Sequence, residues 1–295
     1  MIDYLSYVRQ SENWEDYELI DTSSGERLER WKDIILIRPD PQIVWKTEKG
    51  SMWEEAHARY HRLSSGGGYW ERYRDVPDVW TIKYKDLLFN VKPMGFKHMG
   101  IFPEQAVNWD LLRNIIKGKK KDKFSVLNLF AYTGGATLAC AKEGASVCHV
   151  DASKGMVTWA KENAKISGLA DANVRYIVDD CMKFVARESR RGNLYDGIIM
   201  DPPSYGRGPN KEVWKLEEKL YDFLIMCDKI LKKDASFLVL NSYTTGLSPT
   251  IMGHMLEIVF KKRGGKVISS EIGLPMNGGI LPSGNTSIWL GEENE

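Results

Sequence analysis

The chain has 295 residues, of which 43% are hydrophobic and 27% are charged, a composition typical of soluble globular proteins and a length that suits about two domains. Lysine and arginine nearly balance aspartate and glutamate, so the formal net charge is +1. This near-zero charge excludes a strong overall field toward nucleic acid, and any basic binding surface has to be local.

Residues 1–92 have a β-rich pattern and are expected to form a smaller accessory domain. Ile34–Ile37 is a short apolar strand, and Trp80–Tyr84 alternates before a turn and a second strand at Leu87–Val91, which predicts a hairpin. In Ser51–Trp80, aromatic residues are interleaved with arginine and histidine, a composition that could stack on nucleic acid and neutralise it. The alternative is that these aromatic residues fill the core of the accessory domain.

From Pro103 onward, helical and strand patterns alternate, which predicts a doubly wound sheet. Pro103 and Glu104 suit the first turn of a helix, and the apolar spacing that follows gives it one buried face. The remaining elements are predicted as strands at 125–130, 146–151, 174–178, 195–200, 236–241, 266–272 and 286–290, and as helices at 135–143, 154–167, 181–190, 211–231 and 250–262.

The stretch Val126–Ala139 predicts a strand, a tight turn with two glycines, and a helix. Such sheets bind ligands at the carboxyl ends of their strands, so Phe130–Thr137 is the expected cofactor site. A dinucleotide site would need G-x-G-x-x-G, but this turn has only Gly134 and Gly135. The missing glycines favour a nucleoside without phosphates, of which S-adenosylmethionine (SAM) is the common one. The alternative is a well-packed loop without a ligand.

Carboxylates follow the next two predicted strands. Asp151 can accept hydrogen bonds from both hydroxyls of a ribose, although Asp151 and Ser153 could equally cap the following helix. Asp179 and Asp180 can accept a hydrogen bond from the amino group of adenine, and capping is again the alternative.

The segment Asp201–Tyr205, with the sequence Asp-Pro-Pro-Ser-Tyr, closes the fourth strand and is the most specific motif. Its two prolines remove backbone donors and stiffen the loop, which leaves carbonyl oxygens as acceptors for a substrate amino group. Tyr205 could stack on a planar base.

The order and spacing of these motifs resemble the class I SAM-dependent methyltransferases over residues 93–291. They closely resemble a bacterial group that methylates large-subunit ribosomal RNA and includes 5-methylcytosine and 7-methylguanosine enzymes. The matching segments are Lys97–Gln105, Asn128–Gly135, Val150–Lys154 with Asn163 and Ala164, Asp179 with Asp180, and Met200–Tyr205.

The resemblance implies SAM as the cofactor. It implies that Gly100, Phe102 and Gln105 cover SAM, that Asp151 holds its ribose, and that Asp180 holds its adenine. The implied binding set is completed by Asn128, Phe130, Ala131, Tyr132, Thr133, Gly134 and Gly135 around the amino-acid part, and by Ala152, Ser153, Asp179 and Asp201.

The chain departs from the 5-methylcytosine members in one respect. They place a cysteine nucleophile after the fifth strand or directly after the two prolines, where this chain has Asn241–Tyr243 and Ser204. A thiolate has to attack the pyrimidine before its C5 accepts a methyl group, and a hydroxyl does not readily replace it. Residues 1–92 also do not match the RNA-binding domain that many members carry.

We therefore expect a Rossmann-like methyltransferase domain at 93–295, with a seven-stranded sheet whose last hairpin is reversed, after a β-rich domain at 1–92. The expected reaction transfers a methyl group from SAM to a base nitrogen of RNA, with ribosomal RNA as the substrate. Asp201 and the carbonyls of Pro202 and Pro203 are expected to orient the acceptor while Tyr205 stacks on it. The alternatives are a small-molecule or protein substrate, or a SAM-binding module without catalysis.

Cysteine usage and hydropathy predict a reduced, cytoplasmic setting. The four cysteines have no C-x-x-C spacing, so neither a zinc site nor a disulfide framework is indicated, and we expect no metal. The chain has no run of about 18 apolar residues, and its amino-terminal stretch carries Asp3 and Arg9, so we expect no membrane partner. The sequence does not indicate an oligomeric state.

Overall fold

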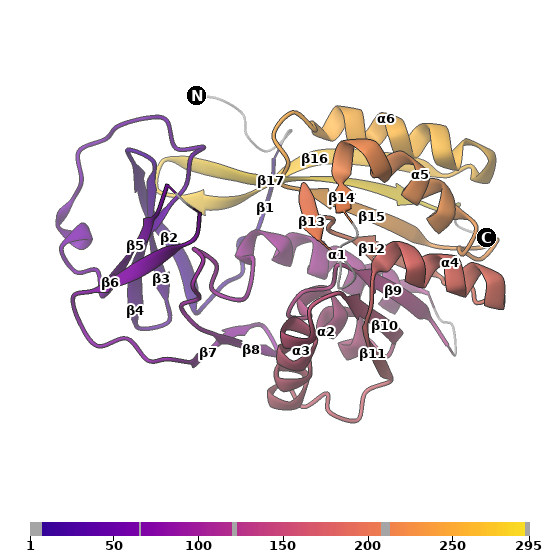
Figure 1. Cartoon of the computed structure of the whole chain (residues 1–295), viewed down its shortest axis with the longest axis horizontal. Helices are drawn as coiled ribbons and strands as arrows, with labels where there is room; N and C mark the ends of the chain where they lie inside the picture. The colour runs from indigo at the N-terminus through magenta and orange to yellow at the C-terminus, as the bar shows by residue number, and fades with distance from the viewer. Residues whose placement is uncertain (1–7, 65, 120–122, 208–212, 293–295) are drawn as a thin grey trace.

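The centre of the molecule is a sheet whose strands pair in the order β1-β16-β17-β15-β12-β9-β10-β11 (Figure 1). The structure is a computed structural model and describes residues 8–64, 66–119, 123–207 and 213–292. Neighbouring strands are parallel except at β17, which runs antiparallel to β15 and β16. The strands are β1 Val8–Gln10, β9 Ser125–Leu129, β10 Ser146–Asp151, β11 Val174–Val178, β12 Gly197–Met200, β15 Phe237–Ser242, β16 Lys266–Met276 and β17 Gly279–Leu290.

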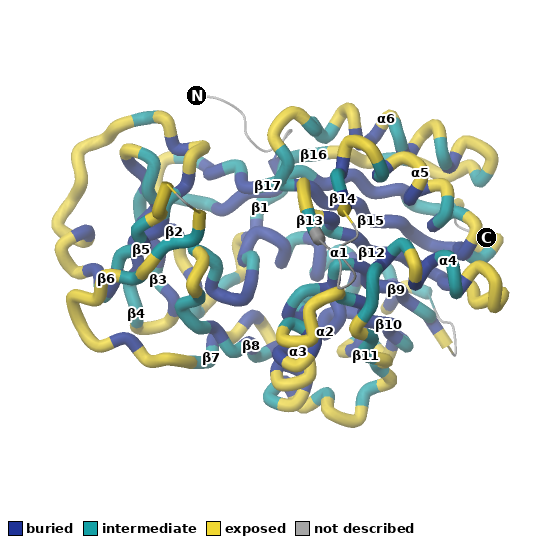
Figure 2. Tube along the Cα trace, viewed as in Figure 1, coloured by how far each residue is buried: buried dark blue, intermediate teal, exposed yellow. Residues whose placement is uncertain are grey.

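Helices cover both faces of this sheet, so its central strands are apolar on both sides and lie buried (Figure 2). On one face Leu129 packs with Phe184 and Phe223, and on the other Val126 packs with Leu112. None of the helices in the described ranges is long and apolar enough to cross a membrane. The helices are α1 Ala106–Gly118, α2 Gly135–Lys142, α3 Lys154–Ile166, α4 Cys181–Arg191, α5 Leu216–Asp228 and α6 Pro249–Phe260.

The seven strands predicted for this sheet are all present, including the reversed hairpin, and β1 is an additional strand. Val8–Gln10 pairs with Glu271–Gly273 of β16 and satisfies backbone groups that an edge strand would leave open. The β16–β17 hairpin is longer than predicted because its outer end packs Leu274 and Leu281 against the amino-terminal region.

The predicted start of the helix at 211–231 was wrong, because α5 begins at Leu216. Residues 211 and 212 lie outside the described residues, and Val213–Lys215 forms a strand, β14, that pairs with β13, Tyr205–Arg207. The indole of Trp214 is buried and donates a hydrogen bond of 2.6 Å to the carbonyl of Pro203. This anchor holds the segment as an extended hairpin, although its sequence is compatible with a helix.

The amino-terminal region forms a second sheet in the order β2-β3-β4-β5-β6 and a separate hairpin of β7 and β8. The hairpin predicted at 80–91 is therefore confirmed. The strands are β2 Tyr17–Ser23, β3 Glu26–Trp31, β4 Ile34–Pro39, β5 Ala58–Arg62, β6 Gly68–Arg72, β7 Trp80–Tyr84 and β8 Leu87–Val91, and short helical turns lie at η2 Ser51–Trp53, η3 Pro103–Gln105 and η4 Lys261–Arg263.

The aromatic residues of the amino-terminal region divide between core and surface. Trp53 and Tyr60 are buried, as the core interpretation predicts, whereas Tyr69 and Tyr73 are about half exposed. Of these four rings, the two exposed ones can contact a nucleic acid, and one face of Tyr69 is already stacked on His61.

A buried ionic cluster joins the amino-terminal sheet to the segment that leads into α1. Glu29 accepts hydrogen bonds from Nε and Nη2 of Arg38 at 2.6 and 2.8 Å and from the hydroxyl of Tyr17 at 2.7 Å. Burial alone would raise the pKa of Glu29, but Arg27 and Arg38 lower it to about 2. Nη1 of Arg38 donates to the carbonyl of Lys97 at 2.7 Å, so the cluster also fixes the segment before η3.

Replacing Glu29 by glutamine is expected to lower the free energy of unfolding by about 3–5 kcal/mol, because two buried guanidinium groups lose their carboxylate. Urea denaturation followed by circular dichroism measures the change. Glu18→Gln, which removes an exposed ion pair with Arg30, is the matched control and should cost at most about 1 kcal/mol. Glu29's contribution should be present above its unfolded pKa of 4.5 and be lost as pH falls toward about 2. Equal losses in the two variants would contradict this account.

Candidate functional site

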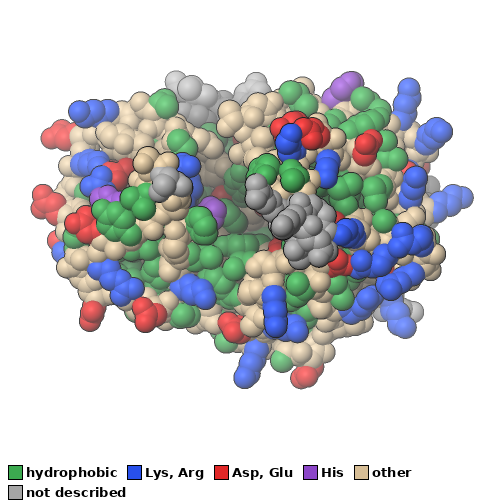
Figure 3. Space-filling model, in the orientation of Figure 1, with side chains coloured by type: hydrophobic (Ala, Val, Ile, Leu, Met, Phe, Trp, Pro, Cys, Tyr) green, Lys and Arg blue, Asp and Glu red, His purple; other side chains and the backbone are tan. Residues whose placement is uncertain are grey.

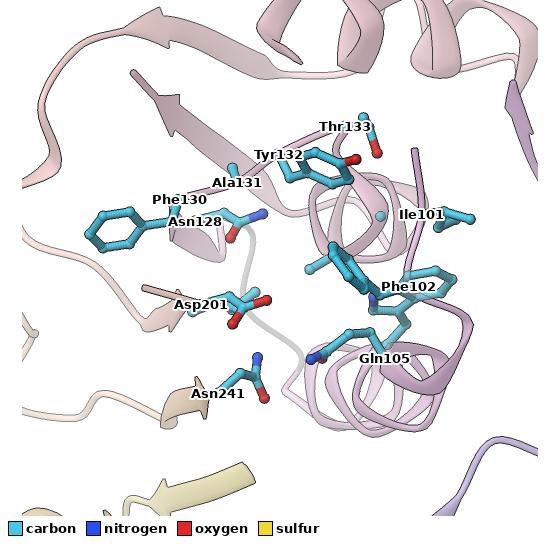
Figure 4. Close-up of a pocket in the computed structure, with 14 residues that line it drawn as sticks. Ile101, Phe102, Gln105, Asn128, Phe130, Ala131, Tyr132, Thr133, Asp201 and Asn241 are labelled. Atoms are coloured by element: carbon cyan, nitrogen blue, oxygen red, sulfur yellow. The ribbon is translucent and has the colours of Figure 1, made fainter. Parts of the chain in front are cut away.

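Two adjoining cavities lie at the carboxyl ends of the parallel strands. The larger has a volume of about 360 Å³ and the smaller about 60 Å³, and both are lined by Phe102, Phe130, Tyr132 and Asp201. The space-filling view shows the molecule hollowed between the amino-terminal region and the rest (Figure 3), and the close-up shows the smaller cavity (Figure 4). Both cavities thus lie at the edge of the sheet where the site is predicted.

The turn after β9 has an unusual backbone. Phe130 and Tyr132 adopt φ angles of 54° and 49°, which non-glycine residues rarely adopt, and Gly134 has φ 90°. A Cβ on Gly135 would lie 2.4 Å from the ring of Trp109, so glycine allows α1 and α2 to approach closely. Most of the predicted turn residues line the smaller cavity, namely Asn128, Phe130, Ala131, Tyr132, Thr133 and Gly135, whereas Gly134 shapes the turn without lining it.

Asp151 lines the larger cavity at the end of β10. One of its oxygens accepts the backbone N–H of Tyr132 at 2.9 Å, and the other accepts that of Ser153 at 2.8 Å. Burial raises the pKa of Asp151, and these two N–H groups oppose that rise. Each carboxylate oxygen keeps a further acceptor position, so the group can still take two hydroxyl donors.

The two aspartates after β11 have different surroundings. Asp180 lines the larger cavity and also caps α4, where it accepts the backbone N–H of Lys183 at 2.9 Å. Asp179 does not line either cavity, and its carboxylate is paired with Arg187. At the preceding helix, Ser153 caps α3 and Ala152 lines the larger cavity. Asp180 therefore caps α4, and its place in the cavity is compatible with the contact to adenine that the resemblance implies.

Asp201 follows β12 and lines both cavities, and Figure 4 shows its carboxylate in the smaller one. Its carboxylate has no hydrogen-bond partner among the described residues. Burial, together with the nearby carboxylate of Glu104, raises its pKa to about 7. A carboxyl group with this pKa in a cavity can accept and release a proton near neutral pH.

The loop after Asp201 forms one wall of the larger cavity through Pro202, Pro203 and Ser204. The carbonyl of Pro203 already accepts the indole N–H of Trp214, and the hydroxyls of Ser204 and Thr244 are 2.6 Å apart. Tyr205 belongs to β13 and does not line the cavity, and its side chain is 53% exposed. Its ring therefore lies outside the cavity wall.

The segment before α1 covers the site from the opposite side. Phe102 and Gln105 line the smaller cavity, and the carbonyl of Gly100 accepts the hydroxyl of Thr133. A Cβ on Gly100, whose φ is 98°, would lie 2.3 Å from the ring of Trp159. All three residues predicted in this segment thus lie at or beside the turn after β9.

The residues of the site that had no predicted role there include His98, Trp214, Asn241 and Tyr243. Asn241 ends β15, and Tyr243 follows it, so the strand-end rule that found Asp201 could also have found them. No sequence signal marks Trp214, because its position in the cavity wall depends on the hydrogen bond to Pro203. Burial, with Arg38 and Lys97, lowers the pKa of His98 to about 4, so this imidazole is neutral at pH 7.

Comparisons with known proteins give one consistent family. The family model described as S-adenosylmethionine-dependent methyltransferase matches residues 58–232. A ribosomal RNA large subunit methyltransferase K/L of Shewanella sediminis is 39% identical over 216 residues, which is 71% of this chain and 27% of that protein. The chain spans between 16% and 34% of the length of the first curated relatives that it matches.

Solved structures resemble nearly the whole chain. A SAM-dependent methyltransferase from Agrobacterium tumefaciens superposes with a TM-score of 0.92 at 36% identity, covering 97% of this chain and 93% of that one. SMU.776, a putative methyltransferase complexed with S-adenosylhomocysteine (SAH), has a TM-score of 0.73 at 19% identity, covering 95% and 76%. At 19% identity, the similarity to SMU.776 shows a shared fold.

The residues at the site fit the cofactor that this family uses. The spare acceptor positions of Asp151 suit the two hydroxyls of a ribose, and Asp180 offers a carboxylate in the same cavity. The glycine at 135 and the left-handed residues of the turn bring the backbone to the wall of the smaller cavity. SAM supplies a methyl group on a positively charged sulfur.

Replacing Asp151 by alanine should weaken binding of both SAM and SAH by about 1.5–3 kcal/mol, because charge-assisted hydrogen bonds are lost. Isothermal titration calorimetry measures both affinities. Asp171→Ala, which removes an exposed carboxylate between α3 and β11, is the control and should bind as the wild type does. Unchanged binding in Asp151→Ala, or no binding by the wild type, would refute the cofactor assignment.

Proposed function

We propose that this chain, which belongs to the S-adenosylmethionine-dependent methyltransferase family, transfers the methyl group to a base nitrogen of RNA, with ribosomal RNA as the substrate. The observation that carries the proposal is the carboxylate of Asp201. This carboxylate has no hydrogen-bond partner among the described residues. It lines both the smaller cavity, beside the turn after β9, and the larger cavity, which is lined by aromatic rings.

Asp201 is proposed to orient the acceptor nitrogen and to take its proton. A nitrogen that bonds to a methyl carbon has to release a proton, and a carboxylate within hydrogen-bond reach can accept it. The pKa of about 7, raised by burial and by Glu104, keeps a substantial fraction of Asp201 ionised at neutral pH. The same pKa makes it a stronger base than an exposed aspartate, for which about 3.9 is usual.

The walls of the larger cavity suit a planar base. Phe102, Trp214 and Tyr243 contribute aromatic rings to its lining, and Pro202 and Pro203 contribute a stiff loop. A base inside a folded RNA has to leave its stack to reach Asp201, and aromatic side chains compensate for part of the lost stacking. Tyr205, exposed on β13, is proposed to stack on the substrate at the mouth of the cavity.

RNA is the proposed substrate for two reasons. Relatives such as the Shewanella sediminis protein are named as ribosomal RNA large subunit methyltransferases. In addition, Lys and Arg side chains gather on the right of the face seen in Figure 3, where α4 exposes Lys183, Arg190 and Arg191. A local basic surface of this kind can contact phosphates although the net charge is near zero.

The remaining assignments follow from this function. We propose a cytoplasmic location, where ribosomal RNA is accessible. We also propose residues 1–92 as an accessory domain and 93–295 as the methyltransferase domain, supported by the separate amino-terminal sheet. Parts of 1–92 contact the other domain directly, since strand β1 joins the large sheet, and β8 hydrogen-bonds to α3 and the residue that follows it.

Asp201→Asn should lower turnover by about 10²–10⁴-fold, because the amide cannot accept a proton, while SAH affinity changes less than about twofold. The assay follows transfer of labelled methyl groups from SAM to ribosomal RNA purified from cells that lack the gene. The wild-type rate should rise with pH through about 7, because the ionised carboxyl is the active form, and the variant should lose this dependence. Full methylation by Asp201→Asn would exclude this mechanism, and labelling of protein or small molecules instead of RNA would exclude the substrate.

No covalent complex should form with RNA that contains 5-fluorocytosine. Ser204 and Asn241–Tyr243 occupy the positions where a nucleophilic cysteine would stand. Cys181 lines the larger cavity, but burial raises the pKa of its thiol well above the usual value, so it remains protonated and unreactive. Denaturing gel electrophoresis tests this, and a denaturant-stable complex would contradict it.

A further inference from the structure

We propose that Arg9 and Asn108 are positioning residues that hold the side-chain amides of Gln105 and Asn241 with their N–H groups directed into the pocket at Asp201. This inference rests on the proposed role of Asp201 as the proton acceptor. It connects the edge strand β1 to the chemistry at the carboxyl end of the central strand β12.

A buried cluster of amides lies between α1 and the strands β15 and β17. Nδ2 of Asn108 lies 2.9 Å from Oε1 of Gln105, 3.0 Å from Oδ1 of Asn241 and 3.1 Å from Oγ1 of Thr286. The hydroxyl of Thr286 is 2.7 Å from the same Oδ1 of Asn241. Arg9 donates to Oδ1 of Asn108. The four clustered side chains of α1, β15, β17 and η3 are each at most 8% exposed.

Arg9 determines which way the side-chain amide of Asn108 is turned. A guanidinium can only donate hydrogen bonds, so the atom of Asn108 that it contacts has to be the carbonyl oxygen. The nitrogen of Asn108 then donates to its neighbours, which have to present their own carbonyl oxygens to it. The usual ambiguity between the oxygen and the nitrogen of an amide is thereby removed at Gln105 and Asn241.

The consequence appears at the pocket, which both amides line. With their oxygens engaged by Asn108, their nitrogens face the cavity, and Figure 4 shows both nitrogens directed toward Asp201. One hydrogen of Gln105 goes to the hydroxyl of Tyr243 at 2.9 Å. For Asn241, no described residue accepts from Nδ2, so its donors remain available to the pocket.

N–H groups directed toward a carboxylate favour its ionised form through their dipoles, even though no hydrogen bond joins these amides to Asp201 in the structure. The other titratable groups around Asp201 do not favour its ionised form. Glu104 on η3 opposes ionisation, and Tyr243 after β15 and His98 before η3 are neutral at pH 7. Asp151 and Asp180, at the ends of β10 and β11, also line the larger cavity. Among all these groups, the amides of Gln105 and Asn241 supply N–H donors on the side of α1 and β15. Reversing them would replace those donors with carbonyl oxygens and disfavour the carboxylate.

The test is a carbon-13 NMR titration of labelled aspartate carboxyl groups, with the Asp201 resonance assigned by its loss in Asp201→Asn. This measurement needs neither substrate nor activity. In Asn108→Asp, the new carboxylate still accepts from Arg9 but cannot donate, so Gln105 and Asn241 turn their nitrogens away from the pocket. The titration of Asp201 should then move up by about one pH unit. Asn108→Leu, which adds no charge, should move it upward by a smaller amount.

Asn114→Asp is the matched control, because it makes the same change at an exposed position of the same helix and should leave the titration in place. Arg9→Lys retains a group that can only donate, so it should preserve the pKa of Asp201. Arg9→Gln can present its amide oxygen to Asn108 and should raise that pKa. Circular dichroism and thermal melting confirm that each variant is folded. The two Arg9 variants test the same point if the Asn108 variants fail to fold.

A shift in Asn108→Asp with none in Asn108→Leu would show an effect of added charge alone and overturn the inference, as would unchanged titration in both Asn108→Asp and Arg9→Gln. Failure of the proposed function looks different. Full methylation by Asp201→Asn would remove the proton-acceptor role, whatever the titrations of the Arg9 and Asn108 variants show, and the inference in its functional form would fall with it.

Discussion

All parallel strands of the central sheet end at one edge, and this constraint brings the groups of the site together. β9, β10, β11, β12 and β15 run in the same direction, so the turn at Phe130–Gly135 and the side chains of Asp151, Asp180, Asp201 and Asn241 surround the same two cavities. Apolar side chains on both faces of these strands fix the edge in place. The loops at this edge can therefore carry polar and strained residues without loss of the fold.

The same constraint explains what the sequence could predict. Asp151 and Asp201 follow apolar runs that are recognisable as strands, so their places were accessible from local pattern alone. Trp214 was not, because a hydrogen bond to Pro203 holds its segment extended where the pattern indicated a helix. The short strand at Val8–Gln10 gave no signal either, since its structure depends on pairing with β16, which is far away in the sequence.

Electrostatics links the amino-terminal sheet to the site. The buried cluster of Glu29, Arg27 and Arg38 anchors the backbone at Lys97, and its cations help to keep His98 neutral beside the larger cavity. On the other side, burial raises the pKa values of both Glu104 and Asp201. Two acidic groups close to each other in a buried place cost stability, and retaining them is typical of functional sites rather than of cores. The amino-terminal region thus affects the charge of His98, which lines the larger cavity.

The most direct test of the central claim is mass spectrometry of nucleosides from the ribosomal RNA of cells that lack the gene. The account predicts that one base-methylated nucleoside, with the methyl group on nitrogen, is depleted in these cells. Expression of the wild-type chain should restore it, and expression of Asp201→Asn should not. An unchanged set of methylated nucleosides in the deletion cells, or full restoration by Asp201→Asn, would contradict the account.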